Sequence, residues 1–347
     1  MKALNSIWLL ARRCWLIPVL LVFSQAVHAD TWKLQVGAQS DKSRQALAFL
    51  PNEIWIHSGD NITWTFPANE IHTVTLLTPG QPRPSRLTGC PGAMTPDGRT
   101  PDFSAYDGTA CVNSGITFNS GGLAAAPTYT VVFPYPVSGN FKLVCLAHTN
   151  MTATIHVLPL SATLPHDQAF YDKQGSEETA ELLSDATDML ADTMTSAHNH
   201  SDNGDIIAGV GHIMGNGGGT QTASVMRFMD AVKVIHVGET VEWTSAEAVT
   251  SHTITFGNAF DPPNPTPPSA NVTSDPNNNA RYATISSPSD VVHSGFITQA
   301  PQDAANQPQV PLGVMRFRVT FTQPGIYPYR CVLHDDLGMV GQVIVLP

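Results

Sequence analysis

The feature that most constrains the fold of this chain is one order of four side chains that occurs twice. In each half a histidine is followed, roughly 70 to 80 residues later, by a cysteine, a second histidine and a methionine. The two sets are His72, Cys145, His148 and Met151, and His252, Cys331, His334 and Met339. Chance repetition of four such residues in one order is improbable, so the pattern predicts a duplicated structural unit.

Further matches between the halves support this interpretation. They are collinear, and they pair Phe49 with Phe228, Trp64 with Trp243, Ser114 with Ser294 and Gly139 with Gly325. The interval from the last glycine of each set to the following cysteine is the same in both halves. Several matches in one order indicate duplication of a whole unit rather than of one motif.

Short segments with alternating apolar residues, separated by Gly, Pro and Asn turns, fill each unit. This pattern predicts an all-β fold with two tandem antiparallel β-sandwiches. The predicted boundaries are a first domain at 30–160, a linker at 161–205 and a second domain at 206–347. The insertions Pro79–Pro127 and Asn258–Pro311 are rich in Pro, Gly, Ser and Asn, and predict long surface loops with little regular structure.

The linker carries ten acidic residues and one basic residue, Lys173. Its apolar residues recur with helical spacing, which predicts a docked helix over Ser176–Met194. Glu177 and Glu178 would then lie in the first helical turn, where negative charge is favourable. The sequence therefore predicts an acidic and partly helical connection.

Thiolate, imidazole and thioether side chains together are the donor set of blue-copper centres, in which Met is a weak axial ligand. The repeated set therefore predicts two copper centres with four ligands each. Thr73 and Thr253 directly follow the first histidine of each set, and are either candidates for hydrogen bonds toward the cysteine loops or ordinary strand residues. His57 and His236 also recur, and we interpret them as structural or surface histidines.

These motifs resemble the cupredoxin family, namely its plastocyanin, pseudoazurin and amicyanin group, over about 130 residues in each half. The resemblance implies two cupredoxin-like Greek-key β-sandwiches, each binding one type-1 copper ion through a strand His, a Cys, and a His and Met of the following loop. The loop from Cys331 to Met339 has the plastocyanin-like spacing. The loop from Cys145 to Met151 has the shorter amicyanin-like spacing.

Residues 1–29 have the features of a secretory signal peptide. The basic residues Lys2, Arg12 and Arg13 precede an apolar run, and Ala29 ends a stretch suited to cleavage. The run is short for a membrane span. We expect an exported protein, periplasmic or secreted, without stable membrane insertion after cleavage.

Loss of residues 1–29 removes three of the 17 Lys and Arg and none of the 28 Asp and Glu, so the remaining chain is strongly acidic. This balance argues against nucleic-acid binding and favours redox partner proteins with basic docking surfaces. Cys90 and Cys111 lie in one Gly/Pro/Ser-rich stretch. In an oxidising compartment they are predicted to form a disulfide.

The leading interpretation of function is an exported electron carrier that is not an enzyme. A two-domain multicopper oxidase or copper nitrite reductase needs a second kind of copper bound by further histidines, usually flanking the cysteine. No histidine flanks either cysteine, and the one His-x-His pair, His198 and His200, lies in the linker. A copper storage or delivery protein would use the same ligands and remains the alternative.

Overall fold

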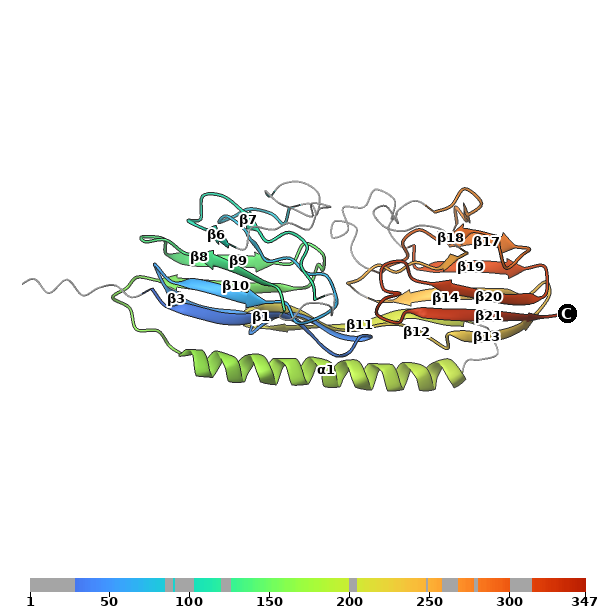
Figure 1. Cartoon of the computed structure of the whole chain (residues 1–347), viewed down its shortest axis with the longest axis horizontal. Coiled ribbons are helices and arrows are strands. Elements are labelled where there is room, and N and C mark those ends of the chain that lie inside the picture. The colour runs from blue at the N-terminus through green and yellow to red at the C-terminus, as the bar shows by residue number, and fades with distance from the viewer. Residues whose placement is uncertain are drawn as a thin grey trace, which may run out of the picture.

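The computed structural model of this chain consists mainly of β-strands and one long helix (Figure 1). It describes residues 29–84, 90, 103–119, 126–199, 205–247, 249–257, 268–277, 280–299 and 314–347. Within these residues the strands form two β-sandwiches that lie side by side along the long axis of the molecule. The predicted all-β fold class is confirmed, whereas nearly all of the predicted signal peptide lies outside the described residues.

Each half contains a five-stranded sheet, and the two sheets have equivalent strand orders. The order is β3-β10-β9-β5-β7 in the first half and β13-β21-β20-β15-β18 in the second. The bounds are β3 Glu53–His57, β5 Thr75–Leu76, β7 Val112–Asn113, β9 Gly139–Val144, β10 Thr152–Leu158, β13 Val232–His236, β15 Thr255–Phe256, β18 Val292–His293, β20 Gly325–Arg330 and β21 Val340–Leu346. Equivalent orders in two segments are what a duplicated unit predicts.

The other layer of both sandwiches is a single sheet of eleven strands, in the order β16-β17-β19-β14-β11-β12-β2-β1-β4-β8-β6. The bounds are β1 Thr31–Asp41, β2 Arg44–Leu50, β4 Asn61–Thr65, β6 Phe103–Ala105, β8 Thr128–Val132, β11 Asp205–Asn216, β12 Gly219–Met229, β14 Thr240–Ala246, β16 Thr273–Ser274, β17 Arg281–Ile285 and β19 Arg316–Phe321. Several pairs, including β1 with β4 and β11 with β14, are parallel. The turn pattern had predicted purely antiparallel sandwiches. This prediction is wrong for these strand pairs.

The two halves meet at the antiparallel pairing of β2 with β12, where Ala46 lies opposite Ala223. Outward from this pair, the order β2-β1-β4-β8 on one side repeats as β12-β11-β14-β19 on the other. An antiparallel pair at the centre of a repeated order gives the molecule an approximate two-fold relation between its halves. The halves are thus joined by backbone hydrogen bonds as well as by the linker.

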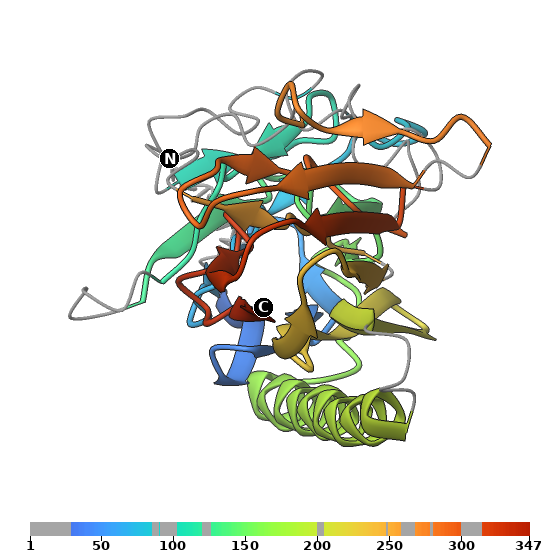
Figure 2. The same ribbon diagram turned by 90° about the vertical axis from the view of Figure 1, so that its right-hand side faces the viewer.

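The linker forms α1, Gln168–Asn199, which runs alongside both halves (Figures 1 and 2). It is longer than the predicted helix because Asp167 caps it: the Phe170 N–H donates to Asp167 Oδ1 at 2.9 Å. Glu177 and Glu178 consequently lie in the interior of the helix rather than in its first turn. The predicted apolar face is confirmed, since Leu182 and Ala186 are buried against the strands around the β2/β12 pair.

The helix reaches the sheet closely at Gly175. A Cβ built at this position would lie 3.1 Å from the backbone carbon of Leu50, at the end of β2. A Cβ at this distance from backbone atoms would be tighter than most real contacts, so a glycine favours this close approach of the helix to the strand end. Gly175 therefore fixes how deeply α1 packs on the first half.

The two insertions contain more regular structure than their composition predicted. Strands β6 and β7 lie in the first insertion and β16, β17 and β18 in the second. These strands have five residues or fewer, and they form because they add to existing strands such as β8 and β19. Pairing of this kind depends on tertiary contacts, which a local composition argument does not see.

The predicted disulfide between Cys90 and Cys111 is confirmed, with a Cα–Cα distance of 5.5 Å. Its sulfur atoms pack in a small buried cluster with Leu77, Val144 and Leu146. The last two residues flank Cys145. The disulfide therefore attaches the first insertion to the back of the strand end that carries this cysteine.

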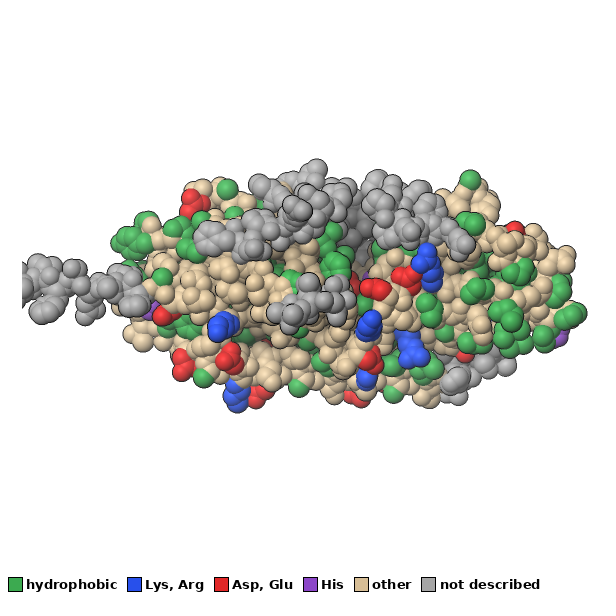
Figure 3. Space-filling view, in the orientation of Figure 1, with side chains coloured by type: hydrophobic (Ala, Val, Ile, Leu, Met, Phe, Trp, Pro, Cys, Tyr) green, Lys and Arg blue, Asp and Glu red, His purple; other side chains and the backbone are tan. Residues whose placement is uncertain are grey.

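The outer faces of the two five-stranded sheets differ. In the first half Trp55 stacks on His156, with ring centroids 4.4 Å apart, and His166 of the linker packs on its edge. In the second half the equivalent position is Val234, which is 60% exposed, close to the exposed Ile326. Figure 3 shows hydrophobic side chains over this part of the second half.

Among the described residues, no helix has both the length and the apolar character needed to cross a membrane.

We expect Leu182→Ala to lower the free energy of unfolding by about 2 to 4 kcal/mol, because it leaves a cavity between α1 and the sheet that joins the halves. Ser184→Ala is the matched control, because Ser184 is exposed on the same helix. Chemical denaturation of the two variants measures the difference. Equal stability of both variants would show that α1 does not contribute to holding the halves together.

Candidate metal centres

The first centre lies at one end of the first sandwich. His72 precedes β5 and pairs with Thr117 in an isolated bridge, Cys145 directly follows β9, and His148 lies in the turn before β10. One ligand atom from each of these three side chains lies within 4.8 Å of the others. All three side chains are buried. The fold thus brings together a histidine and a cysteine that the sequence separates widely.

The second centre repeats this arrangement. His252 pairs with Ile297 in an isolated bridge, Cys331 follows β20, and His334 lies in the turn before β21. Their ligand atoms also lie within 4.8 Å of one another, and the side chains are buried. His334 Nδ1 lies 3.4 Å from Cys331 Sγ and 3.2 Å from His252 Nδ1. Three potential metal donors therefore converge on one buried point.

Two threonines tie each cysteine loop to the histidine strand. The backbone N–H groups of Thr73 and Thr253 donate to Cys145 Sγ and Cys331 Sγ, each at 3.4 Å. Their hydroxyl oxygens accept from the N–H groups of Leu146 at 2.7 Å and Val332 at 2.9 Å. The interpretation of these threonines as hydrogen-bonding residues of the cysteine loops is confirmed.

Met151 and Met339 close the two loops. In each case the cysteine N–H donates to the methionine carbonyl oxygen at 3.0 Å, which fixes the length of the loop. Both side chains are fully buried and pack in the same core cluster as the cysteine of their half. Their role as weak axial ligands stays a prediction.

Two glycines that the sequence analysis did not single out shape the histidine sites. Gly37 in β1 and Gly209 in β11 have φ values of +70° and +74°, and both lie at register shifts of their strands. A Cβ would lie 2.3 Å from His72 Nε2 in the first half and 2.2 Å from His252 Nε2 in the second. The glycines therefore leave the space that each imidazole ring occupies. The only sequence signal is a Gly inside a strand pattern in both halves.

The donor atoms fit a soft metal ion. Three buried ring nitrogens have no hydrogen-bond partner among the described residues. They are Nδ1 and Nε2 of His72 and Nε2 of His252. A buried polar atom without a partner is costly, and coordination by Nδ1 would satisfy one of the two nitrogens of His72; the Nδ1 of His252 lies 3.2 Å from His334 Nδ1. Together with a buried sulfur, these imidazoles form the His₂Cys set that copper prefers.

The cysteine and the loop histidine of each centre shift each other's pKa. Burial raises the pKa of the Cys145 thiol, but its contact with His148 more than offsets this and holds the pKa well below its ordinary value. Burial lowers the pKa of His148, and contacts with Cys145 and Glu70 raise it to about 9. Cys331 and His334 shift in the same directions, the latter to about 9. In each centre the contact with the loop histidine thus shifts the cysteine toward the thiolate, which is the form that binds metal.

A buried carboxylate that the sequence analysis missed lies between the centres. Glu70 Oε1 is 3.2 Å from His148 Nε2, and Glu70 Oε2 is 3.8 Å from His334 Nε2. Burial raises the pKa of Glu70, but the hydrogen bond to His148 and the positive charges nearby leave it below its ordinary value. No local pattern identifies this residue, because its contact with the second half arises from the pairing of β2 with β12.

A second buried carboxylate, Glu247, follows β14. It accepts hydrogen bonds from Ser224 at 2.8 Å and from the Val249 N–H at 3.3 Å. Burial raises its pKa to about 7 despite these hydrogen bonds. Gly211 provides its space, since a Cβ there would lie 2.1 Å from Glu247 Oε1.

The other histidines of the sequence analysis do not join these centres. His57 Nε2 lies 2.9 Å from the Ala162 carbonyl oxygen, and His236 is exposed on the surface, as interpreted. The side chains of His198 and His200 lie outside the described residues. Across the described part of the chain, the two His-Cys-His groups are the sets of three or more potential ligands that could hold a metal ion.

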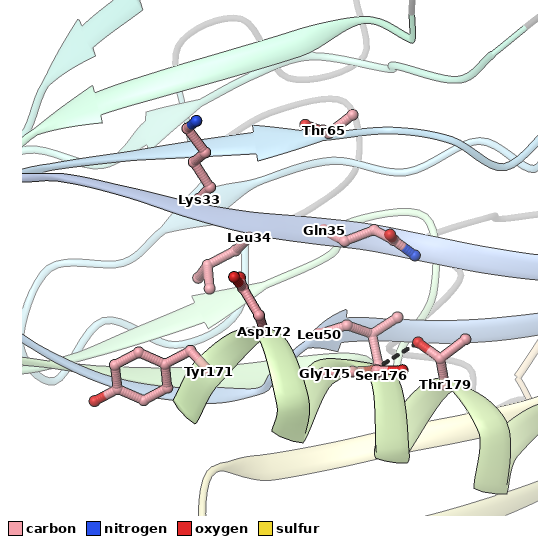
Figure 4. Close-up of a pocket in the computed structure, with 10 residues that line it drawn as sticks. All are labelled: Lys33, Leu34, Gln35, Leu50, Thr65, Tyr171, Asp172, Gly175, Ser176 and Thr179. Atoms are coloured by element: carbon pink, nitrogen blue, oxygen red, sulfur yellow. Dashed lines mark hydrogen bonds between the residues drawn. The ribbon is translucent and has the colours of Figure 1, made fainter. Parts of the chain in front are cut away.

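A groove of about 450 Å³ lies elsewhere, between α1 and β1 (Figure 4). Tyr171, Gly175 and Thr179 line it from the helix, and Lys33 and Gln35 from the strand. None of the eight predicted ligands lines this groove. It contributes nothing to the metal centres.

A buried cysteine beside two imidazoles, on a loop that closes a β-sandwich, is the donor arrangement of a blue-copper centre. Residues 217–346 match the family model described as copper binding proteins of the plastocyanin/azurin family. Residues 217–346 are therefore similar to that family, and the first half has an equivalent five-stranded sheet and an equivalent His-Cys-His group. The predicted cupredoxin resemblance is confirmed.

Solved structures similar to this chain are also cupredoxins. Plastocyanin from Dryopteris crassirhizoma is 17% identical, with 41% of this chain and 99% of that chain covered and a TM-score of 0.21. A purple cupredoxin from Nitrosopumilus maritimus is 20% identical, with 41% and 98% covered and a TM-score of 0.21. Auracyanin from Roseiflexus castenholzii is 15% identical, with 35% and 88% covered and a TM-score of 0.22. No curated protein matches the sequence.

We expect Gly37→Ala to weaken copper binding at the first centre at least tenfold while the second centre is unchanged, because the new methyl group displaces the His72 ring. Gly209→Ala should have the mirror effect. Copper titration of each variant measures this.

Gly80→Ala is the control for the backbone effect. Gly80 has a similar φ of +78°, but nothing lies within 4 Å of a Cβ there. A loss of copper in this variant equal to that in Gly37→Ala would show that left-handed backbone strain, and not contact with the histidine, causes the effect.

We expect Glu247→Gln to change how the stability of the metal-free protein depends on pH. The folded pKa of about 7 exceeds the reference value of 4.5. The folded state therefore retains a proton that the unfolded state loses, and stability falls as pH rises between these values. A shift of this size corresponds to about 3 kcal/mol.

The free energy of unfolding of Glu247→Gln, relative to the natural protein, should thus increase by about 3 kcal/mol between pH 4.5 and pH 8. Denaturant unfolding at several pH values measures it, and Glu181→Gln, at an exposed position on α1, is the control. Parallel pH profiles for the natural protein and Glu247→Gln would contradict the prediction.

Proposed function

We propose that this chain is an exported electron-transfer protein with two type-1 copper sites. The first site would consist of His72, Cys145, His148 and Met151, and the second of His252, Cys331, His334 and Met339. The observation that carries this proposal is the pair of buried His-Cys-His groups, each with a backbone N–H directed at the sulfur. The family match of residues 217–346 supports copper as the metal.

Copper supplies a one-electron couple between Cu(II) and Cu(I) at such a site. The protein contributes a donor set that is held in place before the metal binds. Strand pairing fixes the first histidine, and the Thr hydroxyl and the Met carbonyl fix the cysteine loop. A site that changes little between oxidation states lowers the cost of moving an electron.

Burial of the ligands favours electron transfer over copper storage or delivery. All eight side chains are at most 3% exposed. Delivery requires that an acceptor reach the metal, whereas an electron can pass through closely packed protein. Storage or delivery with the same ligands remains the second candidate.

An oxidase or nitrite reductase would need further histidines around a second kind of copper. Each of the two groups of potential ligands in the described residues contains two histidines. The proposed type-1 sites use all four of these histidines. The proposal therefore assigns no catalytic residue to this chain.

The acidic mature chain supports redox partners with basic surfaces, and the signal-peptide features of residues 1–29 support a periplasmic or secreted location. Such partners cannot contact the loop histidines, because His148 and His334 are only 2% and 3% exposed where the two halves of the chain meet. A docking partner would exchange electrons through another face of the molecule.

We expect the copper-loaded protein to bind two coppers and to show intense visible absorption in its oxidised form, because a thiolate ligand transfers charge to Cu(II). Cys145→Ser and Cys331→Ser should each remove one copper signal and leave the other. Metal analysis and visible spectroscopy measure this. A colourless protein, or loss of both signals in one variant, would contradict the proposal.

We expect the two sites to differ in reduction potential. Asp335 and Asp336 lie next to His334, and negative charge stabilises Cu(II) over Cu(I), which lowers the potential. Asp335 is ion-paired with Arg330, so the charge effect is smaller than that of two free carboxylates. Asp335→Asn combined with Asp336→Asn should raise the potential of the second site only.

Redox titration of this double variant, with the first site removed by Cys145→Ser and, separately, the second by Cys331→Ser, resolves the two potentials. Equal potentials in the natural protein, or no response to the double substitution, would show that the charge argument is wrong.

A further inference from the structure

One buried side chain touches a candidate ligand of each centre. Glu70 contacts His148 Nε2 at 3.2 Å through one carboxylate oxygen and His334 Nε2 at 3.8 Å through the other. Glu70 is 4% exposed. A carboxylate excluded from water interacts strongly with hydrogen-bond donors, because no solvent competes for them.

The two histidines face Glu70 with the ring nitrogen that is not directed at the cysteine. His148 Nδ1 lies 3.7 Å from Cys145 Sγ, and His334 Nδ1 lies 3.4 Å from Cys331 Sγ. An imidazole that binds a metal through Nδ1 carries its proton on Nε2 and donates it to an acceptor. The Nε2–H of His148 would then donate to Glu70, while His334 Nε2 faces the other oxygen of the same carboxylate at 3.8 Å, an ion-pair contact rather than a hydrogen bond.

This arrangement is not a consequence of the duplication. The position two residues before the strand histidine is Glu70 in the first half, but Thr250 in the second. The neighbouring Asn69 is anchored to Gln39, with its N–H donating to Gln39 Oε1 at 2.9 Å and its side-chain oxygen accepting from Gln39 Nε2 at 2.7 Å. A single carboxylate can reach both centres because the halves are related by an approximate two-fold relation at β2 and β12.

We infer that Glu70 is a shared positioning residue that couples the two metal centres. This inference rests on the proposed function. Glu70 holds both histidines in the tautomer that presents Nδ1 to the metal, and its negative charge acts on both centres. A residue of the first half thereby sets the metal affinity of the second.

The shared acceptor also makes the coupling reciprocal. A metal ion bound at one centre polarises the imidazole of its loop histidine and makes the Nε2–H of that ring a stronger donor to Glu70. The Glu70 carboxylate then interacts differently with the histidine of the other centre. By thermodynamic linkage, the factor by which loading of one centre changes the affinity of the other is the same in both directions.

The test uses Glu70→Gln in the full-length chain, which keeps the size of the side chain but removes its charge. In the Cys145→Ser background, where the second centre alone is loaded, we expect copper affinity at that centre to fall 10- to 100-fold, as for other carboxylates that hydrogen-bond a ligand histidine. In the Cys331→Ser background the first centre should weaken by a similar factor. An unchanged second centre would overturn the inference.

Glu178→Gln is the control, because it removes another carboxylate that is partly buried but lies on α1, with hydrogen bonds to Gln174 and Gln221. Nitrogen-15 NMR of the Cu(I)-loaded protein measures the chemical shifts of the histidine ring nitrogens. A general loss of stability does not change these shifts in the folded protein. The Nε2–H resonances of His148 and His334 should both shift in Glu70→Gln and stay in place in Glu178→Gln. A shift of His148 alone would show that Glu70 serves one centre only.

Copper analysis separates this inference from the proposed function. Two coppers in the natural protein, with unchanged affinities in Glu70→Gln, would leave the proposed function intact and overturn the coupling. A third copper that is lost in Glu70→Gln would show that the carboxylate is a metal ligand, and would overturn the inference in its present form. Absence of copper from the parent protein would overturn the proposed function itself.

Discussion

The antiparallel pairing of β2 with β12 is the constraint on which the rest of the structure depends. It merges one layer of each β-sandwich into a continuous eleven-stranded sheet, with small side chains such as Ala46 and Ala223 at the junction. Because hydrogen-bond register along this pair is fixed, the two halves have one relative orientation. The α1 helix packs over the junction through Leu182 and Ala186, and adds buried apolar contacts to the backbone hydrogen bonds.

In this orientation the loop histidines of both centres, His148 and His334, lie where the two halves meet. In an isolated domain His148 or His334 would have solvent beside its outer nitrogen, whereas here the outer nitrogens lie beside the buried carboxylate of Glu70. Glu247 adds a second buried carboxylate near the same histidines, and its raised pKa reflects the cost of burying its charge. Two sites that duplication made similar have thus acquired a common environment.

The sequence predicted the β-sandwich class, the disulfide and the convergence of three residues in each centre, because repeated motifs carry this information. It also suggested the role of Thr73 and Thr253, since both directly follow a ligand histidine. Glu70 could not be predicted, because its function depends on contact between segments whose pairing has no local signal. Gly37 and Gly209 carried only a weak signal, and the start of α1 at Gln168 was missed because Asp167 was not recognised as its cap.

The most direct test of this account is a crystal structure of the copper-loaded protein, with copper located by anomalous diffraction. The account predicts two copper peaks, one among His72, Cys145 and His148 and one among His252, Cys331 and His334, with Glu70 between the outer nitrogens of the two loop histidines. A single peak bound by Glu70 at the interface, or copper bound only outside these groups, would contradict it.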